Sequence, residues 1–213
     1  MKIRLCRADE MSSVAKLHID CFPDSFSTVF GKGNSGRLLE KYYREYYKES
    51  PALFFVAEEG GKIVGLCMGF ICGGKNSARE FLKNNLLSVT FRMLRLLICG
   101  DEVAWKKIAS LMKKTKEISI EEPDHTTYAE REHAEVLSLC VAAEYRGRGI
   151  ADDLMNAFFQ AVLVDGAKIC GLTVRTENKR ATAFYKKLGF IPRSYADDSV
   201  YMTKPLVYEE EKC

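Results

Sequence analysis

The sequence lacks the cysteine patterns of disulfide-rich and zinc-binding proteins. None of its 8 cysteines forms a Cys-x-x-Cys pair, and no Cys/His spacing typical of a zinc site is present. Most of the cysteines stand singly inside apolar runs, as Cys67, Cys140 and Cys170 do. We therefore expect buried free thiols in a reducing cytoplasm rather than disulfides.

Long apolar runs and a strong charge imbalance are also missing. No uninterrupted run of about 18 apolar residues occurs, and charges interrupt the segment 1–7, so neither a membrane span nor a secretion signal is expected. The 32 basic and 29 acidic residues leave a net charge of +3, which gives no indication of a nucleic-acid partner. With 213 residues, 47% of them apolar, we expect a single cytoplasmic domain, 1–213.

Hydrophobic periodicity predicts alternating strands and helices. Two β-rich runs flank Gly60 and Gly61, and a Gly-Gly pair supplies the positive φ values of a tight hairpin turn. A helical pattern from 77 to about 116 then interrupts the sheet. The expected strands are 3–7, 53–58, 63–71, 134–143, 168–175 and 199–204. One further helix is expected directly after Asp9, and three more at 38–47, 149–164 and 178–188. This succession indicates a parallel or mixed sheet with flanking helices.

The apolar helical stretch around 86–98 has three interpretations. Arg92 and Arg95 lie within it, so packing against protein is favoured over contact with a membrane. A homodimer surface and an insertion that covers its own core explain the pattern equally well, and the sequence does not separate them.

A glycine-containing turn follows the strand at 134–143. Gly147 and Gly149 expose backbone N–H groups where the next helix begins, an arrangement that suits a pyrophosphate. A tight strand-to-helix connection with exposed arginines explains two glycines equally well. The sequence has no Gly-Lys-Ser/Thr for a nucleoside triphosphate and no Gly-x-Gly-x-x-Gly for a dinucleotide.

Two motifs together resemble the GCN5-related N-acetyltransferase (GNAT) family. The segment 146–151, Arg-Gly-Arg-Gly-Ile-Ala, is similar to the family signature Arg/Gln-x-x-Gly-x-Gly/Ala. Downstream, 178–190 supplies the expected order of Asn, Ala, Phe-Tyr and Leu-Gly-Phe. The resemblance implies an α/β (α+β) fold with a central mixed, mostly antiparallel sheet of about six or seven strands, flanked by helices. The helical segment 73–132 is then an insertion between the third and fourth strands.

The resemblance also implies acetyl-CoA as cosubstrate, with no metal and no covalent acyl-enzyme. Backbone groups of the central strand are expected to pair with the pantetheine arm, and N–H groups of the glycine turn to hold the pyrophosphate. The residues expected to bind the cofactor are Leu139, Val141, Arg146, Gly147, Arg148, Gly149, Ile150, Ala151 and Asn178, with Lys179 and Arg180 as weaker candidates.

Two residues are the catalytic candidates. Tyr185 takes the place of the family's tyrosine near the cofactor sulfur, and a phenol of pKa ~10 can protonate a departing thiolate. Its alternative is a tyrosine that only packs beside Phe184. Glu135 resembles by its offset the catalytic glutamate of the histone-acetylating branch, and its rivals are His133, Glu132 and ordered water. His18 and His125 are expected to be structural or exposed.

The acceptor is expected to be a small-molecule amine. The loop and helix at 24–47 and the insertion at 77–130 are expected to line its cleft, with aromatic and acidic residues suited to a cationic or sugar-bearing amine: Tyr42, Tyr43, Tyr46, Glu121, Glu122 and Asp124. Tyrosines at helical spacing are, however, more often half-buried packing residues than part of a substrate site. Acetylation of a protein or peptide is the alternative, which the bulky insertion disfavours, and a non-catalytic acyl-CoA-binding module is the other.

Overall fold

A central seven-stranded sheet organises the part of the chain that the structure describes. The computed structural model describes residues 1–23, 25, 36–74, 77–100, 102, 105, 132–196 and 198–206. The strands are β1 (Lys2–Leu5), β2 (Phe54–Glu59), β3 (Lys62–Ile71), β4 (His133–Val141), β5 (Ile169–Arg175), β6 (Ile191–Ala196) and β7 (Ser199–Pro205). Their order across the sheet is β1-β2-β3-β4-β5-β7-β6, and all neighbours are antiparallel except β4 and β5.

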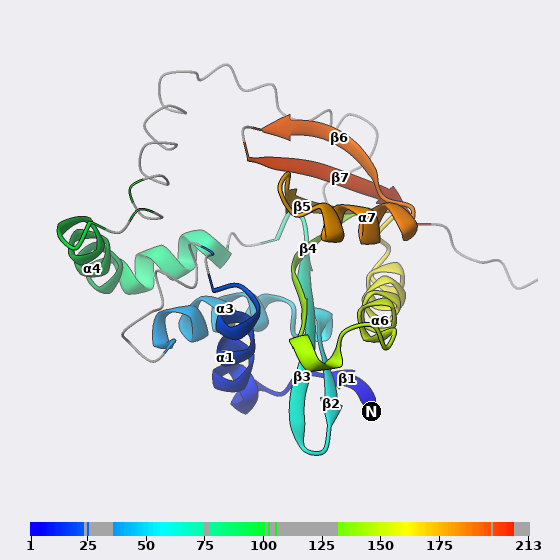
Figure 1. The fold of residues 1–213 in the computed structure, drawn as a ribbon, viewed down its shortest axis with the longest axis horizontal. Coiled ribbons are helices and arrows are strands. Elements are labelled where there is room, and N and C mark those ends of the chain that lie inside the picture. The colour runs from blue at the N-terminus through cyan, green and yellow to red at the C-terminus, as the bar shows by residue number, and fades with distance from the viewer. Residues whose placement is uncertain are drawn as a thin grey trace, which may run out of the picture.

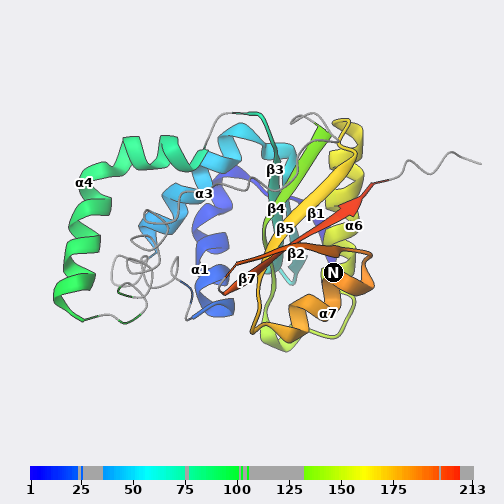
Figure 2. The ribbon, with the colours of Figure 1, turned by 90° about the horizontal axis from the view of Figure 1, so that it is seen from above.

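Helices cover both faces of this sheet (Figure 1). They are α1 (Met11–Cys21), α3 (Arg37–Glu49), α4 (Ser77–Ile98), α6 (Ile150–Val164) and α7 (Lys179–Lys187), with the short helices η1 (Ala8–Glu10), η2 (Pro51–Leu53) and η4 (Ala143–Tyr145). Helices α1 and α3 lie on one face, and α4 packs against α3 and extends away from the sheet (Figure 2). Helix α6 packs on the opposite face, against β2, β3 and β4.

Two hydrophobic clusters hold these layers together. Along α6, the buried residues Leu154, Phe158 and Val162 recur at intervals of four residues and face the sheet. Each fully buried side chain of this size contributes about 1.5–3 kcal/mol. Gly69 makes room for the helix, because a Cβ there would lie 2.6 Å from the Phe158 ring. On the other face, Tyr43 and Phe54 belong to a cluster between the sheet and helices α1 and α3.

The parallel pair β4–β5 is much shorter than its strands. Their residues pair only from His133 with Ile169 to Val136 with Leu172. Beyond that point β4 stays paired with β3 as far as Val141, and β5 stays paired with β7. The two central strands therefore separate toward their C-terminal ends, and the main chain of β4 is open on one side.

Most of the predicted architecture is confirmed. The sheet is mixed and mostly antiparallel, helices flank it, and the insertion begins after the third strand. Strand β6 was not expected from the sequence; it is an edge strand that carries Pro192 and is largely exposed. Helix α4 bends at Asn85, whose backbone is not helical. Among the described residues, no helix is both long and apolar enough to cross a membrane.

Several expectations concern parts of the chain outside the described residues. These parts are most of the 24–36 loop, the helical pattern beyond 105 and the acidic stretch before 132, which includes Glu121, Glu122, Asp124 and His125.

Candidate active site

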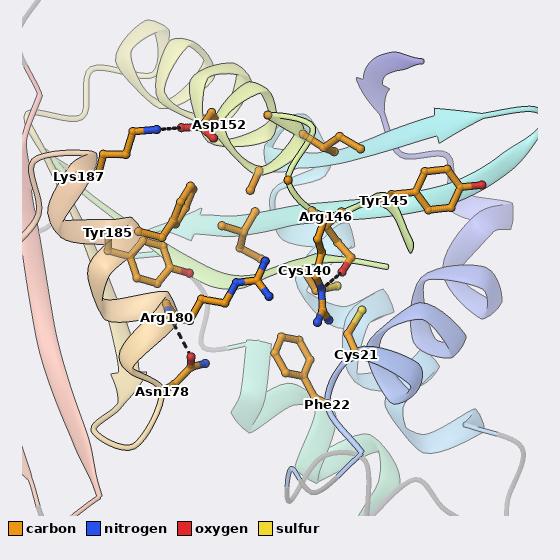
Figure 3. A pocket seen from close by; sticks show the side chains of 18 residues that line it. Cys21, Phe22, Cys140, Tyr145, Arg146, Asp152, Asn178, Arg180, Tyr185 and Lys187 are labelled. Carbon is orange, nitrogen blue, oxygen red and sulfur yellow. Dashed lines mark hydrogen bonds and ion pairs between the residues drawn. The ribbon is translucent and has the colours of Figure 1, made fainter. Parts of the chain in front are cut away.

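A cavity of about 600 Å³ lies where β4 and β5 separate (Figure 3). Helix α7 forms one wall, the end of α1 another, and the turn between β4 and α6 closes one end. Its lining residues are Cys21, Phe22, Leu139, Cys140, Val141, Tyr145, Arg146, Gly147, Gly149, Ile150, Ala151, Asp152, Asn178, Arg180, Ala181, Phe184, Tyr185 and Lys187. The cavity thus collects segments that are far apart in the sequence.

The main chain of β4 offers hydrogen-bonding groups to this cavity. The Ala142 N–H donates to the Val64 carbonyl oxygen of β3 at 2.8 Å. Because main-chain groups along a strand point alternately to either side, those of Leu139 and Val141 face away from β3. The β4–β5 pairing has already ended at Val136. An extended ligand with amide groups can therefore take the position that a continuing β5 would occupy.

The turn before α6 presents backbone N–H groups to the same cavity. Gly147 and Gly149 have φ values of 80° and 79°, in the left-handed region that favours glycine, and Gly149 is the N-cap of α6. A Cβ at either position would meet nothing within 4 Å. The first N–H groups of a helix have no partner within it, and the helix dipole is positive there. The turn is therefore suited to an anion.

The charged side chains near the cavity differ in whether they line it. The Arg146 Nε donates to the Val141 carbonyl oxygen at 2.9 Å, so this guanidinium lies over the end of β4. Arg180 and Lys187 of α7 also line the cavity, and Lys187 pairs with Asp152 at 3.5 Å. Arg148 does not line it; its guanidinium pairs with Glu59 of β2 at 3.5 Å and lies 5.0 Å from the centroid of the Tyr145 ring.

Helix α7 contributes a cap and a tyrosine. The Asn178 side chain accepts a hydrogen bond from the Ala181 N–H at 3.0 Å and so caps the helix. Tyr185 is 9% exposed, and its ring packs against Phe184 and Phe190. Figure 3 shows its hydroxyl directed into the cavity. Burial raises the pKa of Tyr185 above its usual value, which keeps the phenol protonated at neutral pH.

Two thiols meet Arg146 at the wall that α1 forms (Figure 3). A hydrogen bond from the Cys140 thiol and the nearby Arg146 guanidinium lower the pKa of Cys21, against the opposing effect of burial. The pKa of Cys140 is raised by the same hydrogen bond and by its burial. Cys21 is therefore a partly exposed thiol whose pKa lies below that of an ordinary cysteine.

Glu135 belongs to a polar cluster outside the cavity. The Tyr201 hydroxyl donates to the Glu135 Oε1 at 2.6 Å and lies 2.9 Å from the His133 Nε2. The His133 Nε2 and the Glu135 Oε1 are 3.1 Å apart. Gly171 makes room for all three groups, because a Cβ there would lie within 2.7 Å of each of them. Glu135 pairs with Gly171, so it stands one residue before the point where the strands separate.

A second cavity, of about 460 Å³, lies among α1, α3, α4 and β4. Its walls are mostly apolar: Leu38, Leu39, Tyr42, Tyr43, Ala78, Phe81, Leu82, Val89, Met93 and Leu137 line it together with His18. A hydrogen bond of 2.5 Å joins the Tyr43 hydroxyl to the His18 Nδ1, and burial lowers the pKa of His18 to about 4. His18 is therefore buried and neutral at pH 7.

The structure brings together most of the residues expected to bind a cofactor. All of the main candidates except Arg148 line the first cavity, and so does the catalytic candidate Tyr185. Of the two weaker candidates, Arg180 lines it and Lys179 does not. Glu135 does not, and instead forms one cluster with its rival His133. Sequence reasoning missed Cys21, Phe22 and Lys187. Nothing in the sequence pointed to the end of α1, where Cys21 and Phe22 lie. Lys187 could have been found, because it lies seven residues after Arg180 and therefore on the same face of the helix.

Comparisons with known proteins agree with this geometry. A family model described as Acetyltransferase (GNAT) family matches residues 117–190. An N-alpha-acetyltransferase of Sulfurisphaera tokodaii is 27% identical over an alignment 213 positions long, and the alignment covers 96% of this chain and 93% of that protein. An uncharacterized N-acetyltransferase of Methanocaldococcus jannaschii is 38% identical over 74 residues, 35% of this chain and 33% of that protein.

A solved structure shares the fold over nearly the whole chain. It is the PaiA N-acetyltransferase from Thermoplasma acidophilum in complex with coenzyme A, which superimposes with a TM-score of 0.59. The two chains are 14% identical, and the match covers 96% of this chain and 98% of that one.

Proposed function

We propose that this chain is an acyltransferase of the GNAT family that transfers the acetyl group of acetyl-CoA to the α-amino group of a polypeptide. The observation that carries the proposal is the cavity where β4 and β5 separate. It combines an unpaired strand edge, a helix N-terminus and a protonated phenol, which are the groups that a thioester-bearing nucleotide requires.

Each part of acetyl-CoA has a matching group in the cavity. The main chains of Leu139 and Val141 are placed to hydrogen-bond with the amides of the pantetheine arm. The N–H groups of 146–151 and the dipole of α6 suit the pyrophosphate. Arg180 and Lys187 add positive charge at the opposite wall. The PaiA structure was solved with coenzyme A, which supports this assignment.

Tyr185 is the proposed general acid. When the amine nitrogen attacks the thioester carbonyl and the carbon–sulfur bond breaks, the leaving thiolate requires a proton or a hydrogen bond. Burial keeps the Tyr185 phenol protonated, and its hydroxyl points into the cavity. Positioning the two reactants and polarising the carbonyl would supply the rest of the catalysis.

Glu135 is the proposed base. It is partly exposed, and hydrogen bonding to Tyr201 fixes the carboxylate beside His133. The attacking amine has to lose a proton, and the Glu135 carboxylate can accept it directly or through a water molecule. Its place on the α1 side of the sheet implies that the acceptor approaches from the face opposite α6.

A polypeptide N-terminus is the proposed acceptor for two reasons. The Sulfurisphaera tokodaii relative, which aligns over 96% of the chain, is an N-alpha-acetyltransferase by name. An α-amine has a pKa of about 7.7–8.0 against about 10.4 for lysine, so far more of it is neutral at pH 7.5. A small amine is the second candidate. The enclosing position of α4 over the second, apolar cavity favours it.

Gly149→Glu tests the cofactor assignment. The new carboxylate would face the pyrophosphate, so calorimetry should show no binding of acetyl-CoA. Gly166→Glu is the matched control, because Gly166 also has a positive φ (84°) and open space around it but lies at the other end of α6. Normal binding by Gly149→Glu, or equal loss in both variants, would contradict the assignment.

Tyr185→Phe tests the acid. We expect kcat to fall about 100-fold, as for the loss of a general acid, with little change in acetyl-CoA affinity. Release of the CoA thiol measures turnover, and calorimetry measures affinity. Tyr195→Phe is the control, since Tyr195 is an exposed tyrosine of β6. Unchanged turnover in Tyr185→Phe would leave Tyr185 only a packing role.

A peptide with a free α-amine and an internal lysine tests the acceptor class. Tandem mass spectrometry after incubation with acetyl-CoA should place the acetyl group on the α-amine. The same peptide with a blocked N-terminus should stay unmodified. Acetylation of neither peptide, together with thiol release in the presence of small amines, would favour the small-molecule acceptor.

A further inference from the structure

Three potential metal ligands converge on the face of the sheet opposite α6. Cys72 follows β3 directly, and its N–H donates to the His133 carbonyl oxygen at 2.7 Å, which sets the two residues side by side. His133 and Glu135 are two residues apart on β4 and so point to the same face. The thiol sulfur, an imidazole nitrogen and a carboxylate oxygen lie within 4.8 Å of one another.

The spacing of these donors is close to that around a single zinc ion. Bond lengths of about 2.0–2.3 Å at tetrahedral angles place two ligand atoms roughly 3.3–3.7 Å apart. The His133 Nε2 and the Glu135 Oε1 are already 3.1 Å apart. Small rotations of the side chains would bring Cys72 into the same coordination shell.

The three ligand types, a thiolate, an imidazole and a carboxylate, indicate which class of metal ion would bind. A thiolate and an imidazole favour zinc and similar transition metals over magnesium or calcium, which prefer oxygen ligands. Three protein ligands leave a fourth tetrahedral position for water or another group.

The surroundings hold the donors in place. Only 9% of the His133 side chain is exposed, and the absence of a Cβ at Gly171 leaves room for the donors above β5. The Tyr201 hydroxyl donates to the Glu135 Oε1 and fixes the carboxylate, as hydrogen bonds to metal ligands commonly do. Tyr201 reaches the cluster from β7. The site on β4 is therefore completed by residues of β5 and β7 and by Cys72, which follows β3.

We propose that Cys72, His133 and Glu135 form a binding site for one zinc ion per chain. Binding needs neither acetyl-CoA nor an acceptor. One consequence rests on the proposed function: an ion held by Glu135 would prevent this carboxylate from accepting the amine proton, so zinc should inhibit transfer.

Metal titration of the full-length protein tests the site directly. After treatment with a chelator, the wild type should take up one zinc ion per chain in competition with a chromophoric chelator. Cys72→Ser and Glu135→Gln should each weaken zinc binding by at least about 100-fold. Cobalt in place of zinc should give the wild type a thiolate-to-metal charge-transfer band that Cys72→Ser lacks.

Two cysteine variants serve as controls. Cys99→Ser removes an exposed thiol, and Cys21→Ser removes a partly exposed thiol that lines the first cavity. Both should bind zinc like the wild type. Circular dichroism and the melting temperature of the metal-free proteins report whether each variant folds, and Glu135→Gln provides a test that leaves the thiol in place.

Several outcomes would overturn the site. Wild type and Cys72→Ser could bind zinc equally, Cys21→Ser alone could lose binding, or the cobalt complex could lack the thiolate band. Because these measurements use neither acetyl-CoA nor an acceptor, their failure is distinct from failure of the proposed function. Zinc binding without inhibition would retain the site and remove Glu135 from the role of base.

Discussion

The early end of the β4–β5 pairing is the constraint on which the rest of the site depends. After Val136 and Leu172, β4 follows β3 while β5 follows β7, and within the described part of the chain no strand pairs with the other side of β4. The Arg146 side chain hydrogen-bonds to the Val141 carbonyl oxygen there, and an extended ligand could bond to the main-chain groups that remain. The glycine turn and α7 lie at this opening because each directly follows one of the two separating strands.

The same strand register also arranges the polar cluster of His133, Glu135 and Tyr201 on the face of the sheet opposite α6. Where the strands are still paired, Glu135 lies beside Gly171, and the missing Cβ lets Tyr201 reach across β5. Gly171 thus allows the Glu135 carboxylate to be hydrogen-bonded close to the point where β4 and β5 separate. The base candidate and the proposed zinc ligands consequently occupy one site, where an ion and an amine proton would compete.

Most residues that line the first cavity lie in the two sequence motifs that resemble the GNAT family. The turn and capping residues among them, such as Gly149 and Asn178, act within a few residues of their own position, so their spacing carries the information. The cluster of Cys72 with His133 could not be predicted in this way. These residues are 61 positions apart, and only the pairing of β3 with β4 brings them together. The edge strand β6 was missed because its exposed residues show no alternation.

Hydrogen exchange with and without acetyl-CoA tests the central claim most directly. If the pantetheine arm takes the place of a continuing β5, exchange of the Leu139 and Val141 amides should slow when acetyl-CoA binds, together with the amides of 146–151. The amides of β1, at the far edge of the sheet, should exchange as before. Protection confined to α3 and α4 around the second cavity, or no protection at saturating acetyl-CoA, would contradict the account.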